Sequence, residues 1–332
     1  MKILFIGGTG TISTAISKKL VSEGHELYLV NRGNRKIISG AHYITADVGG
    51  NEADLSALIN EVAKDGKFDA VADFIIFDKS QAERDYRLFK DITKQYIFIS
   101  SASVYQKPLN HYVITESTPA YNPYWEYSRK KIECEDFFMQ KYREENFPVT
   151  IVRPSHTYDE RSSPRGVHGD KGSFQVAKRL LDGKPVIIHG DGTSLWVMTH
   201  NSDFAKGFVG LLGNIRAVGE TLHITTDEVL TWNQIYACLA DALGVPLKAV
   251  HISSEYLIKN SDYDFLGSLT GDKANSVVFD NSKLKRLVPT FQPTKCFKDG
   301  IKETVDYVLA HPELQIEDDE FDKWCDKIIL QV

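Results

Sequence analysis

Short apolar runs alternate with amphipathic segments along the first half of the chain. A short continuous apolar run is typical of a strand buried on both faces, whereas apolar positions about three or four residues apart indicate a helix. Regular alternation of the two predicts an α/β fold, a doubly wound parallel sheet with helices on both faces. The expected strands are residues 2–7, 25–32, 41–48, 68–77, 95–103 and 148–155, and the expected helices are 14–24, 52–66, 81–93 and 126–146.

The regular alternation ends after residue 155. Loops rich in Gly, Ser and Asp follow, and an apolar run at 220–226 predicts a strand that returns to the main sheet. We therefore expect residues 1–155, with this strand, to form the sheet domain. Residues 156–332 would form mainly a smaller substrate-binding lobe and a C-terminal tail. Because ligands of open α/β sheets bind at the carboxyl ends of the strands, a lobe over that edge would enclose a cleft.

The composition is that of an ordinary globular chain, with 332 residues, 42% hydrophobic and 25% charged. The net charge is −6, so we expect no nucleic-acid partner, because phosphate binding depends on an excess of Lys and Arg. No apolar run is long enough for a membrane span, and the N-terminus does not resemble a signal peptide. The cysteines at 134, 238, 296 and 325 lack metal-ligand spacing, so we expect a cytoplasmic protein with reduced thiols and no metal.

A glycine-rich turn joins the first expected strand to the first helix. In Gly7-Gly8-Thr9-Gly10, exposed backbone N–H groups and the positive end of the helix would bind a pyrophosphate. With a strand before and a helix after it, this turn predicts a Rossmann-type dinucleotide site, although a purely structural turn is the alternative. Ser13 stands where a third glycine is usual, and its small side chain should be tolerated. The expected cofactor contacts are Gly7, Thr9, Gly10, Thr11 and Ile12.

The end of the second strand indicates the cofactor type. An NAD site usually has Asp or Glu there to bind the ribose 2′-hydroxyl, but this chain has Asn31 and Arg32, followed by Arg35. Cations and no carboxylate favour the 2′-phosphate of NADP, with NAD possible and a solvated basic loop as the alternative. At the end of the third strand, Asp47 is expected to bind the adenine amine and Val48 to pack on its ring.

Three polar residues are candidates for acid–base chemistry. Tyr127 and Lys131 are four residues apart and share a helix face, and Ser101 follows the fifth strand. The topology brings all three to the carboxyl ends of the strands, near a nicotinamide. A free tyrosine has a pKa of roughly 10, and a neighbouring ammonium and an oxidised nicotinamide would lower it. Tyr127 would then act as acid and base, with Ser101 binding the substrate oxygen and Lys131 the nicotinamide ribose.

These motifs resemble those of the extended short-chain dehydrogenase/reductases, which include nucleotide-sugar epimerases and dehydratases. The matching segments are GGTGTIS (7–13), ISSASVY (99–105), the Tyr127/Lys131 pair, VRPSHTY (152–158), HGDGTSLWVMTHNSDFAKGF (189–208) and 281–308. The resemblance implies catalytic roles for Ser101, Tyr127 and Lys131, and it places Pro154 and Phe74 beside the cofactor. Phe74 is bulkier than the small residues usual in that wall.

Departures from the family pattern concern the substrate. Trp196 stands where nucleotide-sugar members have an arginine that binds the diphosphate, so a simpler sugar or polyol is expected. Trp196 would stack on a sugar ring, or it would be an ordinary core residue. His156 replaces an asparagine and would contact the substrate or be structural. Ala102 and Ser103 replace the Asp-Glu pair of 4,6-dehydratases, which disfavours dehydration and leaves Ser103 as a substrate contact.

We therefore expect an NAD(P)-dependent oxidoreductase or epimerase that acts on a secondary hydroxyl or ketone of a sugar-like substrate. The alternative is a non-catalytic cofactor-sensing or RNA-binding member of the fold, since NRG (31–33) resembles chloroplast stem-loop RNA-binding proteins. The family resemblance implies a homodimer through the helices at 81–93 and 126–146. Contacts between the two copies would include Ile132, Phe137 and Phe138, unless these residues pack within the monomer. The acidic C-terminal tail should pack on the second lobe through one face that carries Phe321, Trp324 and Ile328.

Overall fold

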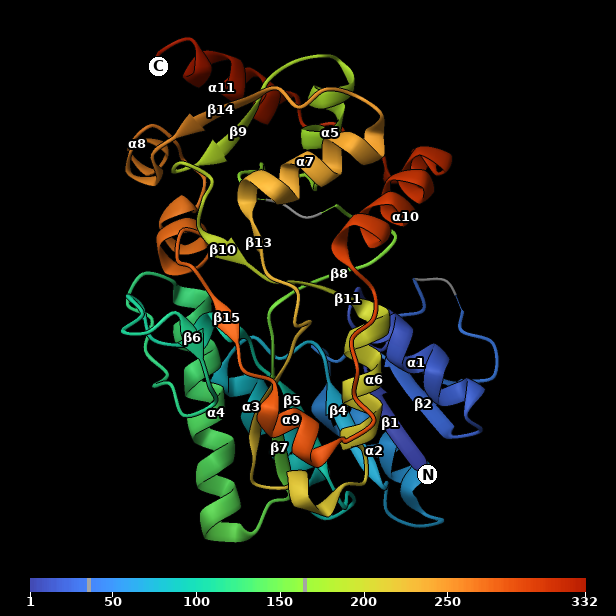
Figure 1. Cartoon of the computed structure of the whole chain (residues 1–332). Coiled ribbons are helices and arrows are strands. Elements are labelled where there is room, and N and C mark those ends of the chain that lie inside the picture. The colour runs from blue at the N-terminus through green and yellow to red at the C-terminus, as the bar shows by residue number, and fades with distance from the viewer. Residues whose placement is uncertain (35–36, 164–165) are drawn as a thin grey trace.

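Seven parallel strands form one central sheet in the computed structural model, which describes residues 1–34, 37–163 and 166–332 (Figure 1). Every pairing between neighbouring strands of this sheet is parallel. The predicted Rossmann-type α/β fold is thus confirmed. In spatial order the strands are β12 (Thr221–Ile224), β7 (Val149–Pro154), β5 (Tyr96–Ile99), β4 (Ala70–Asp73), β1 (Lys2–Ile6), β2 (Glu26–Asn31) and β3 (His42–Thr45).

The central strands have no solvent-facing side. All residues of β4, β5 and β7 are buried, which is why these segments are nearly continuous apolar runs and do not alternate. The strand predicted at 68–77 is shorter than expected and ends at Asp73. The apolar residues that follow it leave the sheet and line the cleft above its edge.

Helices cover both faces of the sheet. One apolar cluster joins the sheet to α1, α6 and α9, and another joins it to α2, α3 and α4 on the opposite face. In α4, Phe137 and Phe138 are buried in this second cluster, so two of the three residues considered for a dimer contact instead pack within the monomer. The helices are α1 (Ser13–Ser22), α2 (Glu52–Ala63), α3 (Lys79–Phe89), α4 (Glu126–Glu145), α6 (Asn201–Leu211) and α9 (Ser282–Leu287).

Segments from the second half of the chain complete the sheet domain. β12 pairs with β7, as expected for the run at 220–226. α6 packs on α1, and α9 packs on β12, so these helices belong to the sheet although they lie beyond residue 155. The chain therefore returns to the first half twice, and the lobes are not consecutive segments.

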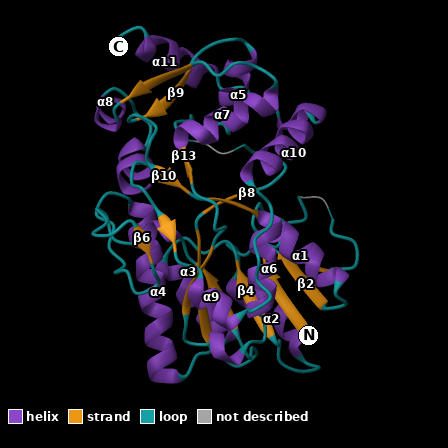
Figure 2. Ribbon diagram, in the orientation of Figure 1, coloured by secondary structure: helices purple, strands orange, loops and turns teal. Residues whose placement is uncertain are grey.

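The second lobe is built from short paired strands and helices around its own apolar core (Figures 1 and 2). Its strand pairs are β6 (Val113–Ile114) with β15 (Val278–Phe279), β8 (His156–Tyr158) with β11 (Met198–His200), β9 (Val186–His189) with β14 (Ala249–Ile252), and β10 (Leu195–Trp196) with β13 (Leu230–Thr231). Its helices are α5 (Phe174–Leu181), α7 (Trp232–Leu243), α8 (Ser254–Lys259), α10 (Phe297–Ala310), α11 (Asp319–Ile329) and the π-helix η3 (Leu266–Lys273). Short 3-10 turns are η1 (Ala102–Val104), η2 (Ile215–Ala217) and η4 (Pro312–Leu314).

The C-terminal tail packs on this lobe, as its apolar pattern predicted. In α11, Phe321 and Ile328 are buried against the lobe core. Trp324 is partly exposed and donates its indole N–H to the backbone carbonyl oxygen of Asn260 at 2.9 Å. Arg179 of α5, itself buried, pairs with Asp322 of the tail at 2.6 Å. No helix in the described part of the chain is both long and apolar enough to cross a membrane.

Candidate active site

The glycine turn has a backbone that side chains would disturb. Gly7 and Gly8 have φ angles of +95° and +84°, a region that residues with a Cβ rarely adopt. A Cβ on Gly8 would lie 2.4 Å from Cδ2 of Leu29, so the turn lies directly on β2. These two glycines let the chain pass closely from β1 into α1, and they leave room above the turn for a ligand.

Ser13 takes part in the turn and is more than a tolerated substitute. Its hydroxyl accepts a hydrogen bond from the Gly10 backbone N–H at 2.9 Å, and its side chain is buried. At the next residue, the Thr14 hydroxyl donates to the Gly10 carbonyl oxygen at 2.7 Å. The first residues of α1 therefore hold Gly10 at both its donor and its acceptor.

A cleft of about 460 Å³ lies over this turn and the ends of β2, β3 and β4. Its size suits part of a dinucleotide, and the glycines provide the close backbone approach that a pyrophosphate needs. Thr11 and Ile12 face the adjoining hollow. Arg35 lies outside the described residues. The other predicted cofactor contacts on this side all line the cleft, and they are Gly7, Thr9, Gly10, Asn31, Arg32, Asp47, Val48 and Phe74.

Side chains at the end of this cleft beside β2 and β3 are arranged by local turns. The Asn31 amide oxygen accepts the Gly33 N–H at 2.9 Å, and an Asp47 carboxylate oxygen accepts the Gly49 N–H at 3.1 Å. Arg32 is exposed and lines the cleft between them. The described lining of this cleft thus offers one cation, at Arg32, and one carboxylate, at Asp47.

Ser101 and Tyr127 face a common hollow of about 310 Å³ at the carboxyl ends of β5 and β7. Burial raises the pKa of Tyr127, while a hydrogen bond with the Ser101 hydroxyl acts to lower it. We expected the Lys131 ammonium to lower this pKa. With the groups of this chain alone the result is the opposite, because loss of solvent is the larger effect.

Lys131 is held beneath the tyrosine by main-chain oxygens. Its Nζ donates to the carbonyl oxygens of Ile76 at 2.5 Å and Ile99 at 2.8 Å. It also lies 5.7 Å from the centre of the Tyr127 ring. Burial lowers the pKa of Lys131 to about 8. The two carbonyls fix the ammonium at the ends of β4 and β5, where the sequence placed it.

Ser103 stands behind Ser101 in a chain of hydroxyls. Its Oγ lies 2.9 Å from the Ser101 Oγ and accepts a hydrogen bond from the Ser128 hydroxyl at 2.8 Å. Ser103 is also buried. Its hydroxyl is therefore in a position to orient Ser101. Ser103 also lines a hollow of about 100 Å³ beside the site, and its contact with a substrate stays a prediction.

His156 and Trp196 meet at the second wall of the site. The Trp196 indole N–H donates to Nδ1 of His156 at 3.3 Å, and the indole packs on Trp232 with ring centres 5.5 Å apart. Only 3% of Trp196 is exposed, so most of its ring belongs to the lobe core and only an edge lines the site. His156 faces both the 310 Å³ hollow and a smaller one of about 100 Å³.

The smaller hollow contains site residues that the sequence did not indicate. It is lined by Lys107, from the loop after η1, and by Asp272, from η3, together with Ser101 and the predicted Pro154. Neither residue lies in a recognisable motif, and their separation along the chain gives no signal of contact.

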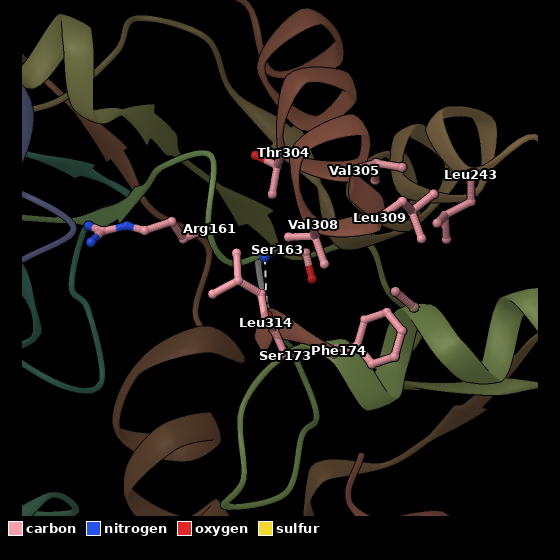
Figure 3. A pocket seen from close by; sticks show the side chains of 11 residues that line it. Arg161, Ser163, Ser173, Phe174, Leu243, Thr304, Val305, Val308, Leu309 and Leu314 are labelled. Atoms are coloured by element: carbon pink, nitrogen blue, oxygen red, sulfur yellow. Dashed lines mark hydrogen bonds between the residues drawn. The ribbon is translucent and has the colours of Figure 1, made fainter. Parts of the chain in front are cut away.

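A further cavity, of about 20 Å³, lies in the second lobe (Figure 3). It is lined mainly by apolar side chains, including Phe174, Val308 and Leu314, and has room for about one water molecule. Figure 3 shows the Arg161 side chain pointing away from these residues, and its guanidinium donates to the Thr9 carbonyl oxygen at 3.4 Å. This cavity is too small for a substrate, and no group of three or more potential metal ligands occurs among the described residues.

Comparison with curated proteins finds relatives at low sequence identity. Among curated sequences, 2'-dehydrokanamycin reductase of Streptomyces kanamyceticus is 24% identical over 88% of this chain and 80% of its own length. The chloroplast stem-loop binding protein of 41 kDa b of Arabidopsis thaliana is 28% identical over 74% of this chain and 64% of its own length.

Solved structures share the fold at low sequence identity. UDP-glucuronic acid 4-epimerase from Bacillus cereus, in complex with UDP-glucuronic acid and NAD, has a TM-score of 0.72 at 21% identity, with 93% of this chain and 99% of that chain covered. The dTDP-glucose 4,6-dehydratase of Bacillus anthracis str. Ames, in complex with NAD, has a TM-score of 0.73 at 19% identity, with 94% and 98% covered. The family model for the NAD dependent epimerase/dehydratase family matches residues 3–225. The chain therefore belongs to the NAD dependent epimerase/dehydratase family.

Proposed function

We propose that this chain is an NAD(P)-dependent oxidoreductase or epimerase that acts on a secondary hydroxyl or ketone of a sugar-like substrate. The observation that carries the proposal is the common position of two hydroxyls and one ammonium. Ser101 and Tyr127 face one hollow beside the dinucleotide cleft, and Lys131 lies beneath the tyrosine ring. This is the arrangement that proton transfer coupled to hydride transfer requires.

Each group has a defined task in this proposal. A substrate oxygen in the hollow would accept a hydrogen bond from Ser101, whose hydroxyl is oriented by Ser103. Tyr127 would take the proton from the substrate hydroxyl during oxidation and return it during reduction. Lys131 would stabilise the phenolate through its positive charge. The nicotinamide, when bound, supplies or accepts the hydride.

The walls of the hollow support a sugar-like substrate. Besides Ser101 and Tyr127, hydroxyl groups line it at Ser155, Thr157 and Ser162. Such groups both donate and accept hydrogen bonds, as a polyhydroxylated ring requires. The relatives point the same way, since their names include a dehydrokanamycin reductase and UDP-glucose epimerases. We propose that 4,6-dehydration is not the reaction, because Ala102 and Ser103 supply no acid–base pair where dehydratases carry carboxylates.

Tyr127→Phe tests the function most directly. We expect NAD(P) reduction with any sugar or polyol that the wild type oxidises to fall at least about 100-fold, because the proton acceptor is lost. Tyr112→Phe, at an exposed tyrosine, is the matched control and should keep full activity. Turnover by Tyr127→Phe at the wild-type rate would show that the mechanism is wrong.

The preference for NADP over NAD is a separate proposal, which rests on Arg32. Its side chain lines the cleft, and the neighbouring Asn31 provides no carboxylate for the ribose hydroxyl. We expect NADP to raise the thermal midpoint more than NAD at equal concentration, and Arg32→Ala to reduce the NADP shift selectively. A larger shift with NAD in the wild type would contradict this preference.

An RNA-binding role is the second candidate, favoured by the similarity to the chloroplast stem-loop binding protein. The net charge of −6 and the Tyr127/Lys131 pair both argue against it. Titration of a labelled RNA stem-loop at physiological salt should show no saturable binding. Saturable binding together with an inactive wild type would make this candidate the better one.

A further inference from the structure

Lys107 is a buried lysine that faces the smaller hollow of the site. Only 1% of it is exposed, and its side chain lines the hollow of about 100 Å³ beside Ser101. Its backbone N–H donates to the backbone carbonyl oxygen of Tyr121 at 2.8 Å, which fixes this part of the loop. Its Nζ forms no hydrogen bond and no ion pair with any described residue. Burial lowers the pKa of Lys107, and its attraction to Asp272 partly offsets this effect.

Asp272 faces the same hollow from the second lobe. It lies in η3, whose backbone is anchored where the Asn122 side-chain amide donates to the Gly271 oxygen at 2.7 Å. The carboxylate of Asp272 accepts no hydrogen bond from the described residues. Burial raises the pKa of Asp272 to about 6, and its charge in turn raises the pKa of Tyr127. This carboxylate is thus close enough to influence the candidate catalytic tyrosine.

The two charges attract each other but do not meet. Each contributes to the pKa of the other, yet no ion pair within 4.0 Å joins Lys107 to Asp272. Buried charges are normally paired and hydrogen-bonded, because each one otherwise loses its solvation without compensation. A donor and an acceptor that both face the same small hollow therefore define a place for a group that satisfies both.

The chemistry of this place selects among ligand groups. A phosphate or carboxylate would be attracted by Lys107 and repelled by Asp272, whereas an ammonium group would experience the reverse. A hydroxyl can accept a hydrogen bond from Lys107 and donate one to Asp272 at the same time. We propose that Lys107 and Asp272 form a recognition pair for an uncharged sugar hydroxyl, away from the reacting carbon that Ser101 and Tyr127 bind. This inference rests on the proposed function, because it takes the substrate to be sugar-like.

Neutralising Lys107 and Asp272 in turn, and changing the charge of the sugar, tests the recognition pair. The probes are D-glucose, 6-amino-6-deoxy-D-glucose, D-glucosamine and D-glucuronate, with the corresponding galactose series, each titrated in the presence of saturating NAD and followed by saturation-transfer NMR. We expect the wild type to bind a neutral sugar at least about 10-fold more tightly than its amino and acid forms. Lys107→Met should raise the affinity for an amino sugar relative to the neutral one by about 10-fold, and Asp272→Asn should do the same for glucuronate.

Two results would overturn the pair: a wild type that prefers the amino sugar or the acid, or variants whose order of preference among the three classes equals that of the wild type. A cooperative thermal unfolding transition and an NAD affinity within about twofold of wild type serve as folding controls. If Lys107→Met does not fold, Lys107→Gln replaces it; if both fail, Asp272→Asn decides alone through glucuronate. The assay needs no turnover, so the two proposals can fail separately. An inactive enzyme would contradict the proposed function and leave the recognition pair standing. Variants with unchanged ligand preferences would contradict the pair and leave the proposed function standing.

Discussion

The hydroxyl oxygen of Ser13 lies 2.9 Å from the backbone nitrogen of Gly10 and accepts its hydrogen bond. This contact explains how the turn works without the usual third glycine, since the serine satisfies a donor at the start of α1. Ser13→Ala would remove this acceptor from a partly buried N–H, and we expect the free energy of unfolding to fall by about 1 kcal/mol. Urea denaturation measures this loss.

Ser22→Ala is the matched control for that prediction. Ser22 lies at the exposed end of the same helix, and its hydroxyl donates to the Lys19 oxygen at 2.7 Å. We expect a change within about 0.5 kcal/mol. Equal effects of the two substitutions would mean that the Gly10–Ser13 contact contributes little.

Lys131 should give the enzyme a pH limit. Burial lowers its pKa to about 8, so the ammonium that would stabilise the Tyr127 phenolate is lost as the pH rises above that value. In the oxidation direction, deprotonation of Tyr127 alone would only raise the rate. We therefore expect kcat/KM for oxidation to fall above about pH 8, and Lys131→Arg, whose guanidinium stays charged, to be slower at pH 7 but to lack this fall. A similar decline in the arginine variant would assign it to another group.

The fold could be predicted from the sequence because the central strands are buried on both faces of the sheet. In β4, β5 and β7 most positions are apolar, with Asp73 and Arg153 as buried charged exceptions, so the runs were visible without structural information. The topology then determined that Ser101, at the end of β5, would lie near the glycine turn after β1. Motif residues at the strand ends were therefore predictable as a group.

The rest of the site could not be read from the sequence, because it depends on how the lobes meet. Lys107 and Asp272 become neighbours only when η3 packs beside the loop after β5, and no periodicity records that contact. The Lys131 ammonium and an oxidised nicotinamide were expected to lower the pKa of Tyr127, whereas the groups of this chain alone raise it, because burial depends on the surroundings and not on the residue spacing. Trp196 fitted both a core and a site residue; the structure buries its ring in the lobe core, and its contact with a substrate stays a prediction.

A buried ion pair next to the site should be strongly coupled. Arg153 of β7 donates to Glu135 of α4 through Nε at 2.8 Å and Nη2 at 2.5 Å, and both side chains are buried. Arg153→Met would leave the carboxylate buried without its partner, and we expect it to cost about 3–5 kcal/mol of stability. Removing both charges, with Glu135→Gln added, should cost less than the sum of the single changes. Additive losses of the free energy of unfolding in urea denaturation would rule out this coupling. Lys259→Met is the control, because Lys259 pairs with Glu255 at the surface, and we expect it to leave the free energy of unfolding unchanged.

The charge of Asp272 should lower the stability of the folded chain. Its pKa is raised to about 6, above its usual value of 3.8, so between these values the folded state binds more protons than the unfolded state. Stability contributed by this group therefore falls as the pH rises from about 4 to 6 and stays low above that range. Asp272→Asn should match the wild type near pH 4 and exceed it by about 1–2 kcal/mol at pH 7, after allowance for partial exposure. A variant less stable than wild type at pH 7 would show that the carboxylate stabilises the fold.

The C-terminal helix should stabilise the second lobe without affecting cofactor binding. Phe321 is 2% exposed and packs into the lobe core, while the glycine turn lies in the sheet domain, between β1 and α1. Phe321→Ala would leave a cavity, and we expect it to cost about 3–5 kcal/mol of stability. Leu330→Ala is the matched control, because Leu330 is 88% exposed and its loss should be nearly neutral. Both variants should bind NAD as the wild type does at a temperature where they remain folded; weaker NAD binding by folded Phe321→Ala would mean that the tail acts on the cleft through the lobe.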